Sequence, residues 1–167
     1  TIGLKLEHKK LIRVMPNTPA QIRKGISAWT ASKEVDRPTL DFVKDMLQAI
    51  GDEIRFTDEK NIDVATALSG SGPGYVFVFI EALTDAGVEL GLPVQTARDL
   101  ASQTVLGSAA LQRESGEHPA ELRNMVTSPG GTTAAGLASL ENGGFRGIIA
   151  DAVRAAFERG EDLAGGK

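Results

Sequence analysis

The sequence contains no cysteine and only two histidines, and these shortages exclude several kinds of chemistry. Without cysteine the chain can form no disulfide, no thiolate zinc site and no cysteine nucleophile. His8 and His118 are far apart in the sequence and have polar neighbours, so we expect no zinc site built from histidines of one chain. The sequence therefore predicts no metal site.

Basic charge and long hydrophobic runs are also scarce. The chain has 22 acidic and 18 basic residues and no basic cluster, which argues against a nucleic-acid partner. The longest apolar run, residues 75–80, is far shorter than the roughly 20 residues that cross a bilayer. No secretory signal is visible, and we expect a cytoplasmic protein with no membrane partner.

What the sequence does contain is the composition of a globular protein. Hydrophobic residues make up 41% of the 167 residues and charged residues 24%, which is enough to build a core. The chain begins with Thr1, and residues 4–10 predict the end of a charged helix. We therefore expect a fragment that has lost an N-terminal part.

Residues 1–58 predict short strands around one helix. The helix over residues 39–50 is amphipathic, and we expect Thr39 to cap it and Gly51 to end it. Strand, strand, helix, strand is typical of an α/β sheet. The three predicted strands are residues 11–15, 26–31 and 52–56.

Residues 59–167 predict five or six helices and no strand. The helix over residues 73–90 is apolar on almost every face, so we expect it to be buried, and a subunit interface would bury it. The helix over residues 94–115 carries small residues on one face, which lets helices approach closely. His118, directly before Pro119, is expected at the start of a short helix on the surface.

The stretch over residues 126–137 is the best candidate for a binding site. We expect Ser128 to cap a helix and Pro129 to lie in its first turn. Gly130 and Gly131 carry no Cβ atom to keep a ligand from the backbone. Free N–H groups, hydroxyls and the positive end of a helix dipole favour a carboxylate or a phosphate. The alternative is an ordinary glycine-containing turn between helices.

The sequence shows no acid, base or nucleophile in a catalytic pattern. The glycine-rich residues 70–74 follow a helix and lack the Lys-Ser/Thr of a phosphate loop, and no dinucleotide fingerprint occurs in the chain. Glu81 could be a buried acid, or it could form an ion pair or reach a subunit boundary. Glu117 could contact a cationic ligand, or it could be a solvated acid in a loop. A reaction carried by a cofactor, such as hydride transfer, would need no such group.

Several motifs together resemble pyrroline-5-carboxylate reductase. They cover essentially the whole chain, and the serine–proline–glycine segment is highly specific to this family. The matching stretches are residues 14–19, 68–75, 81–88, 103–107, 117–119, 126–133 and 141–146.

The resemblance implies an α+β protein that reduces 1-pyrroline-5-carboxylate to L-proline with NADPH or NADH, the last step of proline biosynthesis. Residues 1–58 would be the C-terminal remnant of a Rossmann domain for NAD(P). Residues 59–167 would be an all-α domain for dimerisation and substrate binding. The resemblance also implies a homodimer, which often assembles further into a pentamer of dimers.

The resemblance assigns site residues as well. The substrate carboxylate would lie on the turn, and the nicotinamide near a strand end, in a site that combines two subunits. Residues 69–74 would flank the same pocket, and no catalytic proton donor is identified. The substrate-binding residues would be Ser128, Gly130, Gly131, Thr132 and Thr133, and the cofactor-binding residues Met15, Pro16, Asn17 and Thr18.

The family's glycine-rich fingerprint for the pyrophosphate is absent from these 167 residues. We therefore expect the chain alone to bind NAD(P)H weakly and to be inactive. Two other interpretations stay open, a non-catalytic helical dimerisation module and a domain of a dehydrogenase like 6-phosphogluconate dehydrogenase.

Overall fold

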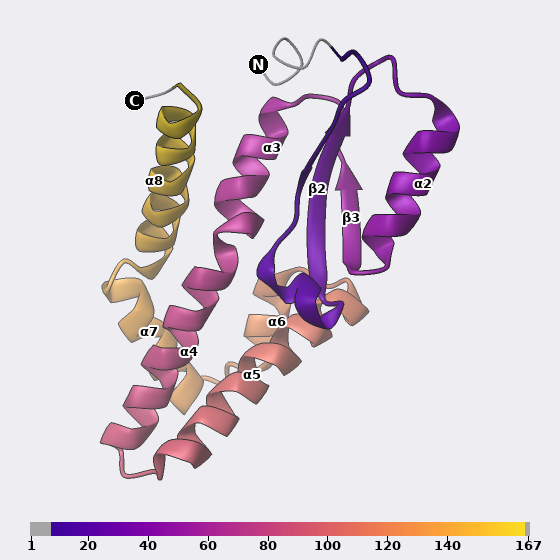
Figure 1. Ribbon diagram of the computed structural model, residues 1–167. Helices are drawn as coiled ribbons and strands as arrows, with labels where there is room; N and C mark the ends of the chain where they lie inside the picture. The colour runs from indigo at the N-terminus through magenta and orange to yellow at the C-terminus, as the bar shows by residue number, and fades with distance from the viewer. Residues whose placement is uncertain (1–7, 166–167) are drawn as a thin grey trace. The chain divides into compact units, whose positions relative to one another are not determined.

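The computed structural model describes residues 8–165, which form a small sheet followed by helices (Figure 1). The predicted helix end at residues 4–10 lies mostly outside the described residues, and residues 8–10 are not helical. The described chain divides into two compact units, one of residues 8–74 with 152–165 and one of residues 75–151. Each unit is described by itself.

The sheet of the first unit has three strands in the order β1-β2-β3. Strand β1 (Ile12–Met15) runs antiparallel to β2 (Gly25–Ala31), and β2 runs parallel to β3 (Gly51–Arg55). Helix α2 (Arg37–Gln48) connects the two parallel strands, as in a βαβ unit. This arrangement confirms the predicted α+β class and fits the end of a Rossmann sheet.

Trp29, the only tryptophan, is the centre of the core of this unit. Its side chain is 2% exposed and packs with Val43 and Leu47 of α2. The indole nitrogen donates to Glu53 Oε2 at 2.7 Å, and the Arg55 guanidinium lies 5.3 Å from the ring centroid. One side chain thus joins β2, β3 and α2.

Asp36, and not Thr39, caps α2. The Asp36 carboxylate accepts from the Thr39 N–H at 3.0 Å and from the Thr39 hydroxyl at 2.7 Å. The prediction of Thr39 as the cap was wrong because Pro38 fits the first helical turn, so the helix begins two residues earlier. Lys10 adds an ion pair to Asp36 at 2.7 Å.

After β3 the described chain is helical, as the sequence predicts. The elements are α3 (Lys60–Ala65), the π turn η2 (Thr66–Gly70), α4 (Gly72–Glu89), α5 (Val94–Ser115), α6 (Pro119–Met125), α7 (Thr132–Asn142) and α8 (Phe145–Gly165). No described helix is long and apolar enough to cross a membrane.

The unit of residues 75–151 has almost no core of its own. All of its residues are described, and only three of them, Thr84, Ala97 and Ala101, are buried. On α4 the side chains of Phe77 and Val78 are 57% and 64% exposed. Within one chain, the burial expected for this apolar helix does not occur.

The cap of α2 generates a prediction about acid stability. Hydrogen bonds from Lys10 and Thr39 hold the pKa of Asp36 well below its ordinary 3.8. A carboxylate with a lowered pKa stabilises the fold above its unfolded pKa and loses that effect as the pH falls through the folded value. We expect Asp36→Ala to lower the melting midpoint, followed by Trp29 fluorescence, by a few degrees at about pH 7 and by less at about pH 2.

Asp36→Asn is the matched control, since it keeps the acceptor for the Thr39 N–H but carries no charge. The difference between the Asn and Ala variants should stay constant with pH. A deficit of Asp36→Ala that is equally large at both pH values would contradict the assignment.

Candidate functional site

The candidate binding turn starts where α6 ends. Thr127 closes this helix twice, with its N–H donating to the Asn124 carbonyl at 3.1 Å and its hydroxyl donating to the Arg123 carbonyl at 2.6 Å. The start of the turn is therefore fixed by hydrogen bonds within about one helical turn.

Residues 128–131 form a tight β-turn. The Gly131 N–H donates to the Ser128 carbonyl at 3.0 Å, and Gly130 has φ of +69°. Proline at the second position and glycine with positive φ at the third are the signature of a type II turn. A Cβ atom on Gly131 would collide with Ser128 Oγ, so a larger residue there would require the Ser128 side chain to move.

The prediction of Ser128 as the helix cap was wrong. Helix α7 begins at Thr132 with Gly131 at the N-cap position, and Pro129 lies in the turn rather than in the helix. The Pro-Gly pair explains the difference, because it closes a type II turn before the helix starts.

No side chain among the described residues caps α7, and its first turn carries no acidic residue. The first intrahelical bond at this end runs from the Ala135 N–H to the Gly131 carbonyl at 3.2 Å. The N–H groups of Thr132 and Thr133 precede that bond, at the positive end of the helix dipole. Thr132 is exposed and Thr133 is half-buried, so an anion can reach this end of the helix.

The four predicted cofactor residues lie together in the first unit. Met15 ends β1, and Pro16 and Asn17 lead into the short 3₁₀ helix η1 (Thr18–Ile22). The Asn17 side-chain oxygen accepts from the Ile26 N–H at 2.9 Å, which holds this segment against the start of β2. Sequence reasoning missed this bond, because the two residues are nine positions apart and no pattern links them.

The π turn η2 lies against the same strand end. A Cβ atom on Gly70 would be 2.6 Å from Met15 Cε, and the Ser71 N–H donates to the Thr66 carbonyl at 2.8 Å. The Met15 side chain thus lies against Gly70, and a place for residues 69–74 beside a cofactor stays a prediction. Turns of this kind are frequent at functional sites.

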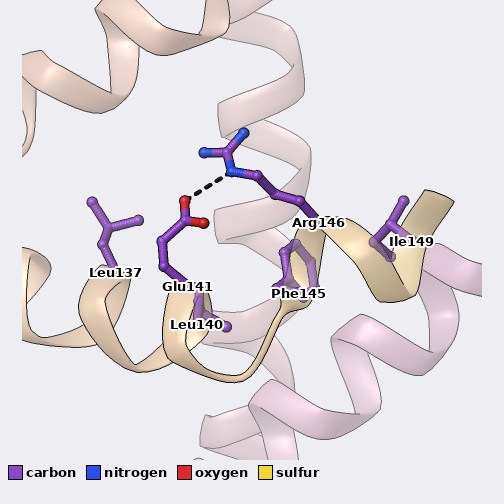
Figure 2. A pocket seen from close by; sticks show the side chains of 6 residues that line it. All are labelled: Leu137, Leu140, Glu141, Phe145, Arg146 and Ile149. Carbon is purple, nitrogen blue, oxygen red and sulfur yellow. Dashed lines mark hydrogen bonds and ion pairs between the residues drawn. The ribbon is translucent and has the colours of Figure 1, made fainter.

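A groove of about 360 Å³ lies between α7 and α8 (Figure 2). Leucine, isoleucine and phenylalanine side chains line most of it, and Arg146 Nε meets Glu141 Oε1 at 2.8 Å on its edge. The Phe145 ring lies 6.1 Å from the Phe79 ring of α4. The groove offers apolar surface and one ion pair, which suits packing better than catalysis.

The structure groups the five predicted substrate residues on one turn of the second unit and the four cofactor residues at one strand end of the first unit. Among the described residues there is no cluster of three or more acidic or histidine side chains that could hold a metal. The roles of the two groups of residues in binding a substrate and a cofactor stay predictions.

Comparison with known proteins gives the family. Residues 59–163 match the family model described as pyrroline-5-carboxylate reductase dimerisation. Pyrroline-5-carboxylate reductase of Synechocystis sp. is 50% identical over 153 residues, which cover 92% of this chain and 57% of that protein. The enzyme of Pisum sativum is 46% identical over 157 residues, which cover 94% of this chain and 57% of that protein.

Solved structures similar to this chain are also pyrroline carboxylate reductases. The reductase of Coxiella burnetii has a TM-score of 0.89 at 40% identity, covering 92% of this chain and 57% of that one. The Plasmodium falciparum reductase with NADP bound has a TM-score of 0.87 at 38% identity, covering 92% of this chain and 62% of that one. The chain thus spans under two thirds of these relatives, and it belongs to the pyrroline-5-carboxylate reductase family.

Proposed function

We propose that this chain serves in the NAD(P)H-dependent reduction of 1-pyrroline-5-carboxylate to L-proline, the last step of proline biosynthesis. The observation that carries the proposal is the uncapped N-terminus of α7 behind the type II turn, in a member of this family. The substrate of the named relatives carries a carboxylate, and an exposed helix N-terminus is suited to that group.

In this proposal Ser128, Gly130, Gly131, Thr132 and Thr133 hold the substrate carboxylate. The helix dipole, the N–H groups and the two threonine hydroxyls all favour a negative charge there. A carboxylate held at one fixed point leaves the cyclic imine little freedom to turn. The turn would thus present one face of the imine carbon to the hydride donor. Orientation of this kind can lower an activation barrier by several kcal/mol.

The proposed cofactor segment fits one end of a dinucleotide. Met15 supplies a half-buried thioether beside Gly70, and Asn17 supplies an amide fixed by Ile26. An apolar surface with a polar group at its edge suits a nicotinamide ring, and bound NADPH or NADH would supply the hydride. No glycine fingerprint for the pyrophosphate occurs in the 167 residues.

The proposed partner is a second copy of the chain. The family model is one of dimerisation, and the unit of residues 75–151 exposes apolar side chains that its own helices leave uncovered. Folding and dimerisation of this unit would then be one event. The start of the family match at residue 59 supports a division into residues 1–58 and 59–167. The pentamer of dimers and the cytoplasmic location stay predictions.

Titration calorimetry tests cofactor binding. We expect NADPH added to this 167-residue chain to give no saturable heat in the low micromolar range, because the pyrophosphate half of the cofactor has no glycine-rich loop to bind. The same titration into the Synechocystis relative is the positive control. Low-micromolar binding by this chain would refute the prediction.

Substitution of Thr133 tests the carboxylate site. In the full-length gene product, Thr133→Ala should raise KM for 1-pyrroline-5-carboxylate about ten-fold and change kcat much less, since the hydroxyl contributes the same binding in ground and transition states. Thr133→Ser keeps a hydroxyl and should stay close to the original KM. An unchanged KM in Thr133→Ala would remove this residue from the site.

Substitution of Phe77 on α4 tests the dimer. Phe77→Asp should shift the mass measured by sedimentation from twice the 17.6 kDa of one chain toward a single chain, because it places a charge on an apolar contact surface. Phe42→Asp on α2 is the matched control, since Phe42 is also an exposed phenylalanine and lies in the other unit. Equal masses for both variants would contradict the assignment of α4 to the interface.

A further inference from the structure

His118 caps the short helix that leads into the carboxylate-binding turn. Its Nδ1 accepts from the Ala120 N–H at 3.2 Å, and Pro119 occupies the first helical position. The side chain is exposed, so solvent protons reach it. Histidine is not among the usual N-cap residues, which are serine, threonine, aspartate and asparagine.

A histidine cap differs from the usual caps because it works in only one protonation state. Neutral imidazole has one ring nitrogen that accepts, whereas the imidazolium has none. Imidazole generally gains its second proton within the range of about pH 5 to 8. The added proton would remove the acceptor for the Ala120 N–H and place a positive charge at the positive end of the helix dipole.

Helix α6 links His118 to the binding turn. It has only seven residues, and in so short a helix one cap is a large part of the local stability. Its far end holds Thr127 through the carbonyls of Arg123 and Asn124, and Ser128 and the type II turn follow directly. A loosened α6 would therefore leave the carboxylate-binding residues less well placed.

The charged groups near His118 come from two elements. Glu117 precedes it, with its N–H bonded to Ser115 at the end of α5, and Glu121 lies in the first turn of α6. The last turn of α5 also carries Arg113 and Glu114. Charged side chains of both signs thus lie on the two elements that meet at His118.

We propose that His118 is a positioning residue for the carboxylate-binding turn, and that its protonation loosens this turn and weakens substrate binding as the pH falls. The inference rests on the proposed function of the turn. It gives a role to the residues 117–119, a motif that the reaction itself does not use.

Two variants separate the cap from the titration. His118→Asn supplies a cap that does not titrate, and His118→Ala supplies none. In the full-length gene product, the quantity to follow is KM for 1-pyrroline-5-carboxylate of the original protein divided by KM of His118→Asn. This ratio should rise about five-fold between about pH 8 and about pH 5.5, which is about the factor by which loss of a typical N-cap changes a folding equilibrium. At the lower pH the original protein should match His118→Ala, while KM for NADPH should be equal in all three.

Dividing by the value for His118→Asn removes the ionisation of the substrate itself, which is common to all three proteins. Parallel KM profiles of the original protein and His118→Asn would overturn the inference. His8→Asn is a further control, because His8 also accepts a backbone N–H, from Lys10 at 3.1 Å, but lies in the other unit. It should leave the profile unchanged.

A structural measurement keeps this inference apart from the proposed function. In NMR spectra of this chain, the amide signals of Gly130 and Gly131 should shift with the same midpoint as the His118 imidazole, and should not shift in His118→Asn. Amide signals that ignore His118 would also overturn it. An enzyme that fails to reduce the substrate at every pH would refute the proposed function and leave this measurement valid.

Discussion

The unit of residues 75–151 cannot bury its own apolar side chains, and this constraint governs the rest of the structure. All residues of the unit are described, and its helices approach one another at few places, such as Gly87 against Ala97 and Phe79 against Phe145. Fully burying one leucine- or phenylalanine-sized side chain is worth about 1.5–3 kcal/mol. A large part of the stabilisation available to this unit therefore has to come from another surface.

The unit that contains the sheet, in contrast, buries a core within one chain. Trp29 collects contacts from β2, β3 and α2 within one chain, and its indole nitrogen has a hydrogen-bond partner. Arg13 of β1 adds ion pairs to Glu59 and Asp63, which tie the chain leading into the π turn to the sheet. The first unit thus has its stabilising contacts within one chain, whereas the second unit leaves most of its apolar side chains exposed.

Patterns of period two and 3.6, with glycine and proline as boundaries, were enough to predict the three strands and α2, α4 and α5 to within a few residues. They did not predict the 3₁₀ helix η1 or the π turn η2. The two wrong caps share a cause. The sequence interpretation placed the caps on the hydroxyl residues Thr39 and Ser128. In the structure a nearby proline decides where each helix begins, and the N-cap residues are Asp36 and Gly131. Capping depends on the backbone conformation before the helix, which composition alone does not reveal.

The site could be predicted only in part, for a related reason. The grouping of residues 128–133 on one turn follows from their adjacency in sequence, and the histidine before Pro119 was expected at a helix start. The bond from Ile26 to Asn17 and the approach of Gly70 to Met15 join residues that are distant in sequence. Contacts of that kind follow from the tertiary fold and have no local signal.

The open first turn of α7 has one more consequence. A helix that no side chain caps is incomplete by one set of hydrogen bonds. A bound carboxylate would supply those bonds itself, so the ligand would become the missing end of the helix. A bound ligand would then make the first turn of α7 more rigid. Protection of its amides from hydrogen exchange would increase with the fraction of chains that hold the ligand.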